Sequence, residues 1–158
     1  MLLPYFQAIE NGPIGAAIRD STWLFPFVEA GHRVALAGIG GAVLLVDLRL
    51  LGLGLKRQPV AVLARDAQPF LIGSLLFMIG SGVPLFMSEA IKCYYSFAFW
   101  TKMSALALAI LFTFTIRRRV AFADEAARVS PAVARAVGAI SILLWSTVGW
   151  GGRWIGFS

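Results

Sequence analysis

The chain has 158 residues, of which 59% are hydrophobic and 14% are charged, and its formal net charge is +6. A soluble domain of average composition carries about 25% charged residues, so this composition excludes an ordinary soluble enzyme. The basic residues cluster at the ends of apolar runs, as topology signals do, which argues against nucleic acid as a partner. We therefore expect an all-α integral membrane protein with a single domain over residues 1–158.

Residues 1–20 do not resemble a cleavable signal peptide. They have no basic n-region, and Asn11-Gly12-Pro13 interrupts their apolar residues. The apolar runs on either side, residues 2–9 and 14–18, are too short to cross a bilayer. We expect a short amphipathic segment at the membrane interface that stays on the mature protein.

Four apolar stretches are long enough to cross a hydrocarbon core of about 30 Å, which takes roughly 20 helical residues. Arg117-Arg118-Arg119 is expected to stop the third stretch, and Ser130-Pro131 predicts an N-cap followed by proline at the first helical position of the fourth. The predicted fold is a four-helix membrane bundle whose spans cover approximately residues 23–55, 67–87, 97–116 and 132–155.

The distribution of lysine and arginine predicts the orientation. One side of the membrane holds Arg19, Arg33, Lys92, Lys102 and Arg153. The other side carries more basic residues, in the loops after the first and third stretches. By the positive-inside rule that side is cytoplasmic, and both termini are on the outer side of a bacterial inner membrane. Its basic residues are Arg49, Lys56, Arg57, Arg65, Arg117, Arg118, Arg119, Arg128 and Arg135.

The first stretch contains an unusual set of polar residues, Glu29, His32, Arg33, Asp47 and Arg49. On a helical wheel Glu29, Arg33 and Asp47 lie within roughly 40° of one another, together with Gly40, while Arg49 points the other way. This pattern predicts an inward face, with Gly40 allowing close packing. Polar groups inside a span are costly and often functional.

Two interpretations of this face remain open. In the first interpretation, a polar pocket or proton path in the outer half of the bundle contains Glu29, His32 and Arg33. Alternatively, Glu29 and Arg33 are an interfacial i,i+4 ion pair, and Asp47 and Arg49 are structural residues at the cytoplasmic end.

His32 is the only histidine and the strongest candidate metal ligand. An imidazole in the outer leaflet suits haem b or copper, or a proton relay. A bis-histidine haem within one subunit is excluded, so haem requires a symmetric dimer or a Met or Lys as second ligand. The alternative is a hydrogen-bonded structural histidine.

Three further charged residues belong to the predicted outer half. Lys102 either extends to the outer surface or neutralises Glu89 or Glu29 inside the bundle. Arg153, between Gly152 and Trp154, either pairs with a carboxylate or anchors the terminus to lipid phosphate.

Four sequence strings occur together in a specific order and spacing. They are WLFPFVEAGH (Trp23–His32), VDLRLLGL (Val46–Leu53), FAFWTKM (Phe97–Met103) and GRWIGF (Gly152–Phe157). In this combination the chain resembles a family of small bacterial inner-membrane proteins known only as a domain of unknown function. The resemblance implies a four-helix membrane fold, implies no activity, and places His32, Asp47, Arg49, Lys102 and Arg153 at family motif positions.

The sequence thus favours a non-enzymatic inner-membrane subunit. Its outer-half cluster of Glu29, His32, Arg33, Glu89, Lys102 and Arg153 would bind a partner, a lipid or a small ligand, with Glu29 holding Lys102 or Arg153. Two alternatives are a redox or metal-handling protein that uses His32, and a small transporter acting as an oligomer. Homo-oligomerisation or assembly into a membrane complex is expected in each case.

Overall fold

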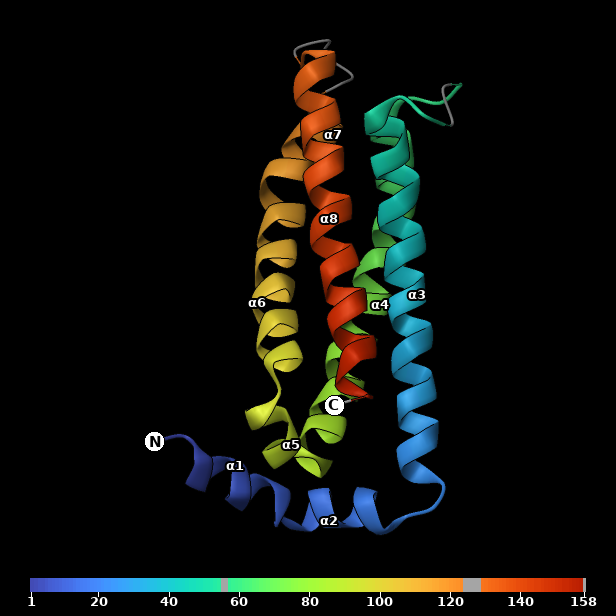
Figure 1. Cartoon of the computed structure of the whole chain (residues 1–158). Helices are drawn as coiled ribbons and strands as arrows, with labels where there is room; N and C mark the ends of the chain where they lie inside the picture. The colour runs from blue at the N-terminus through green and yellow to red at the C-terminus, as the bar shows by residue number, and fades with distance from the viewer. Residues whose placement is uncertain (55–56, 124–128, 158) are drawn as a thin grey trace.

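The structure is a computed structural model that describes residues 1–54, 57–123 and 129–157. All regular elements in these ranges are helical (Figure 1). Two short helices precede the long ones, and a π-helical turn, η1, continues directly from α6. The elements are α1 (Leu3–Glu10), α2 (Pro13–Asp20), α3 (Leu24–Leu51), α4 (Val60–Ser88), α5 (Ala90–Tyr95), α6 (Phe97–Phe112), η1 (Thr113–Arg117), α7 (Arg118–Ala123) and α8 (Pro131–Ile155).

Four helices are long and apolar enough to cross a membrane, as predicted: Leu24–Leu51, Val60–Ser88, Phe97–Ala123 and Pro131–Ile155. They expose large apolar side chains, such as Phe70 and Leu76, which suits helices surrounded by lipid. The fold is therefore that of an all-α, multi-pass membrane protein. The predicted end of the first span at Leu55, and the loop residues Lys56 and Arg128, lie outside the described residues.

The four spans are not packed equally against one another. α3 packs along α4 and α8, and α6 packs along α8. The backbones of α4 and α6 stay farther apart, so α3 and α6 lie diagonally across the bundle. Both helices begin at the end where α1 and α2 lie, so they run parallel (Figure 1).

Apolar side chains and glycines hold the bundle together. Ile39 and Val43 of α3, Met78 of α4 and Val148 of α8 are almost fully buried in the main core cluster. Gly138 of α8 allows a close crossing with α3, because a Cβ there would lie 2.9 Å from a backbone oxygen of α3. The sites below are built around this apolar centre.

The third span does not stop at Arg117-Arg118-Arg119, which corrects the prediction. The helix continues through the π-turn η1 and α7 as far as Ala123. The prediction failed because Arg117 is not a solvated end signal: it is buried and paired with Asp47 of α3. A π-turn inserts one extra residue into a helical turn and often occurs at functional positions.

The amino-terminal segment forms the two short helices α1 and α2, which lie across one end of the bundle (Figure 1). Glu10 Oε2 accepts a hydrogen bond from the Ile91 N–H at 2.6 Å. The Phe6 ring contacts the rings of Phe86 and Tyr94 edge-on. α1 is therefore attached to the loop region between the second and third spans.

Candidate functional site

His32 of α3 is held against α4. Its Cε1 lies 3.3 Å from the position of a Cβ on Gly82, and its Nδ1 lies 3.0 Å from Ser81 Oγ. The Ser81 hydroxyl donates to the backbone oxygen of Phe77 at 2.8 Å, so its one proton is already used. We therefore infer that His32 Nδ1 carries the proton and donates to Ser81, which leaves a lone pair on Nε2.

Lys102 of α6 reaches across the bundle to this lone pair. Its Nζ lies 3.4 Å from His32 Nε2, and the side chain is half-buried. Lysine has only donors, so the ammonium donates to the neutral imidazole. Lys102 therefore points inward to α3, whereas a lysine that extends to the outer surface would not contact His32. Ser81, His32 and Lys102 form one hydrogen-bonded line across three spans.

Lys102 has no anionic partner among the residues that the structure describes. The ion pairs in those ranges join Arg19 to Glu10, Arg33 to Glu29 and Arg117 to Asp47. The nearby Cys93 thiol does not supply a negative charge, because burial, and then the neighbouring Glu89, raise its pKa to about 11. Lys102 is thus a half-buried cation in the membrane bundle without a counter-ion in the described chain.

Glu29 and Arg33 do not line this site. Arg33 Nη2 lies 2.6 Å from Glu29 Oε1, and the Arg33 side chain is 72% exposed. Gly40 is also exposed, with no atom within 4 Å of a Cβ built on it. The predicted inward face was therefore wrong for Arg33 and Gly40, whereas the Glu29 side chain is half-buried. The buried arc of α3 is centred on Ile39, Val43, Val46 and Leu50, and the polar stripe runs along its edge.

Glu89 and Arg153 stay apart from the His32–Lys102 contact. Glu89 is the half-buried residue between α4 and α5, and Arg153 is exposed, with its guanidinium carbon 5.7 Å from the centre of the Phe157 ring. Neither Glu29 nor Glu89 forms an ion pair with Lys102 in the described ranges. The expected neutralisation of Lys102 by either carboxylate was therefore wrong, as was that of Arg153 by Glu29.

A second polar contact joins the same two spans at their other end. Arg117 Nε donates to Asp47 Oδ1 at 2.6 Å, and Arg117 Nη2 donates to the Val43 oxygen at 3.2 Å. The Asp47 and Arg117 side chains are only 0% and 7% exposed. Asp47 Oδ2 and the Ser141 hydroxyl of α8 are also buried at this contact. Arg49 is separate, because its Nε donates to the backbone oxygen of Gln58 at 2.9 Å.

Ser81 was not identified from the sequence, and Arg117 was interpreted as a topology signal. The spacing of the polar residues along the chain could have indicated these two contacts. His32 and Lys102 are 70 residues apart in the chain, and so are Asp47 and Arg117. The two contacts therefore join residues with the same separation along the chain. This equal separation is expected when two parallel helices contact each other at both ends.

The two contacts are separated by an apolar layer. Along α3 they lie about 22 Å apart, at about 1.5 Å per residue. Ile39, Val43, Leu75, Met78 and Val148 fill the space between them. Within the described part of the chain the polar groups thus form two separate sites.

The arrangement of His32 does not fit a haem or copper ligand. Nδ1 faces Ser81, and Nε2 faces the Lys102 ammonium, whose charge repels a metal ion. The described ranges also contain no group of three or more His, Cys, Asp or Glu residues that could hold a metal ion. The line of Ser81, His32 and Lys102 instead presents a cationic donor, which suits an anionic group.

The model of a family of unknown function, DUF6644, matches residues 14–158. The chain belongs to DUF6644. This confirms the resemblance seen in the sequence, and the DUF6644 match covers all four spans and all of α2 except Pro13. Comparison with curated proteins and with solved structures finds no match.

Proposed function

We propose that this DUF6644 protein is a non-enzymatic membrane subunit that binds an acidic group, a carboxylate or a phosphate, at Lys102. The observation that carries the proposal is the half-buried Lys102 ammonium, which contacts a neutral imidazole and has no acidic partner in the described chain. A cation inside a membrane bundle is costly when unpaired and usually has a counter-ion. The bound acidic group supplies that counter-ion.

His32 and Ser81 act as positioning residues in this proposal. Ser81 fixes the imidazole by accepting from Nδ1, and His32 Nε2 in turn holds one N–H bond of the ammonium. An ammonium has three donors, so two remain for the oxygens of the acidic group. A charged hydrogen bond of this kind is stronger than one between neutral groups.

Native mass spectrometry of the purified protein with oleate tests the proposal, with oleyl alcohol as the neutral control of the same chain length. We expect oleate to bind preferentially, and Lys102→Met to lower this preference about tenfold, as the loss of a charged hydrogen bond implies. Lys92→Met removes an exposed lysine on α5 and should leave it unchanged. Equal binding of acid and alcohol, or an unaltered Lys102→Met protein, would contradict the proposal.

The proposed setting is a bacterial inner membrane, with both termini on the outer side. The excess of lysine and arginine at the end of the bundle where α3 connects to α4 and α7 connects to α8 supports this orientation. Alkaline phosphatase fused to the carboxyl terminus should be active, and green fluorescent protein fused there should be dark. The reverse result would invert the topology. Assembly with other subunits or with a second copy stays a prediction.

A further inference from the structure

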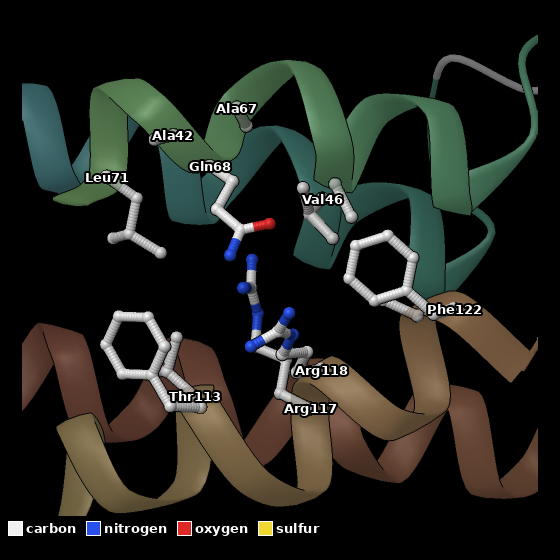
Figure 2. Close-up of a pocket in the computed structure, with 12 residues that line it drawn as sticks. Ala42, Val46, Ala67, Gln68, Leu71, Thr113, Arg117, Arg118 and Phe122 are labelled. Carbon is white, nitrogen blue, oxygen red and sulfur yellow. The ribbon is translucent and has the colours of Figure 1, made fainter.

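A groove opens on the loosely packed side of the bundle, near the basic loops. α4 forms one wall, the segment from η1 to α7 forms the other, and Ala42 and Val46 of α3 form the floor. Figure 2 shows Gln68 on one side of this space and Arg117 and Arg118 on the other. The groove therefore combines mostly apolar walls with several hydrogen-bond donors.

The size of the groove limits which part of a molecule enters it. The cavity has a volume of about 30 Å³, which holds about one or two water molecules. A complete organic ligand does not fit, whereas one or two oxygens of a larger molecule do. The groove opens between two membrane-spanning helices, so the rest of that molecule lies in the lipid.

The charges of the groove favour an anion. Asp47 already neutralises Arg117. Arg118 is exposed, stacks over Phe122 with its guanidinium carbon 5.9 Å from the ring centre, and has no ion-pair partner in the described ranges. Arg118 therefore supplies one uncompensated positive charge, and the half-buried amide of Gln68 adds a neutral donor.

We propose that this groove binds the phosphate of an anionic phospholipid in the leaflet next to the basic loops. Leu71, Phe114 and Phe122 give the groove apolar walls that suit the glycerol and acyl regions of a lipid. Gln68 lies eight residues into α4, about 12 Å along the helix, and a lipid reaches that depth from the side. Basic residues at a membrane surface attract anionic lipids. This site is independent of Lys102.

Native mass spectrometry of the full chain with phosphatidylglycerol and phosphatidylcholine tests the proposal. We expect phosphatidylglycerol to be retained preferentially, and Arg118→Gln to weaken this binding about fivefold. Gln68→Leu, which removes the amide at nearly constant volume, should weaken it less. Arg119→Gln is the matched control, because Arg119 is the exposed neighbour of Arg118 and does not line the groove.

Each other outcome has a definite meaning. Equal losses in Arg118→Gln and Arg119→Gln would overturn the site, because they would indicate attraction by surface charge alone. Equal retention of the two lipids would also overturn it. Displacement of phosphatidylglycerol by inorganic phosphate would show that a free anion, and not a lipid, occupies the groove. Variants that elute as aggregates are replaced by Arg118→Lys, for which we expect partial retention.

Discussion

Arg117 Nε lies 2.6 Å from Asp47 Oδ1, and this contact joins two spans that lie diagonally across the bundle. Both side chains are almost inaccessible, at 7% and 0% exposure. Arg117 is the last residue of the π-turn η1, and the extra residue of this turn changes the direction in which the side chains at its end point. A guanidinium in the interior is stable there only because the carboxylate and the Val43 oxygen accept from it.

Removing one member of this ion pair should lower the free energy of unfolding more than removing both members. We expect Asp47→Ala to lower the free energy of unfolding by about 3–5 kcal/mol, because it leaves Arg117 as an uncompensated buried charge. The double change Asp47→Leu with Arg117→Leu should recover most of that loss. Unfolding in mixed micelles with increasing sodium dodecyl sulfate measures the three values. Additive losses in the double variant would show that the two residues are not coupled.

The crossing of α8 over α3 depends on glycine at position 138. A Cβ there would lie 2.9 Å from the Asp47 backbone oxygen, which cannot move aside as a flexible side chain does. Gly138→Ala should therefore destabilise the protein by about 1–3 kcal/mol. Gly149→Ala is the control on the same helix, because nothing lies within 4 Å of its Cβ position. That change should be neutral or slightly stabilising, and equal effects of the two would contradict the close crossing.

The hydrogen bonds around His32 predict its tautomer. Because Ser81 donates to Phe77, the imidazole should be neutral with its proton on Nδ1 and its lone pair on Nε2. Nitrogen-15 NMR of the single histidine distinguishes the two ring nitrogens. Ser81→Ala should mix the tautomers, since it removes the acceptor for Nδ1–H. An Nε2–H signal in the unaltered protein would contradict the contact with Lys102.

Cys93 should react slowly with thiol reagents. Burial, and then Glu89, raise its pKa to about 11, so only about one thiol in 10⁴ is ionised at pH 7. The rate of N-ethylmaleimide labelling should rise about tenfold per pH unit up to pH 11, and unfolding should abolish this protection. The pKa of Cys93 is higher in the folded chain than in the unfolded chain, so the neutral thiol favours the folded state. This contribution to stability is complete at pH values below the pKa of the unfolded thiol, and it is lost as the pH rises toward 11. Rapid labelling of the folded protein at pH 7 would contradict its burial.

The membrane fold could be predicted because lipid imposes a simple rule on the chain. Every backbone polar group in the hydrocarbon core must be paired within its own helix, so each span appears as one long apolar stretch. The fourth span, predicted at 132–155, is observed as Pro131–Ile155, and the Ser130 hydroxyl accepts from the Val133 N–H as an N-cap. Local signals of this kind need no knowledge of neighbouring helices.

The partners of the polar residues could not be predicted in the same way. The helical wheel placed Arg33 and Asp47 on one face, yet Arg33 is exposed while Asp47 is fully buried. A wheel describes one helix, whereas burial at each level depends on which other helix stands beside it. Arg117 was misjudged for the same reason, because its acceptor lies on another span.

The sequence by itself determined that this chain is a four-span, all-α membrane protein of DUF6644, since apolar length and motif spacing are properties of the chain alone. Only the tertiary structure decided that His32 meets Lys102 and that Asp47 meets Arg117. Both contacts depend on α3 and the third span, from α6 through η1, running parallel at matched heights across the bundle. Packing of α4 and α8 against α3, and of α8 against α6, sets that arrangement, and no local pattern records it.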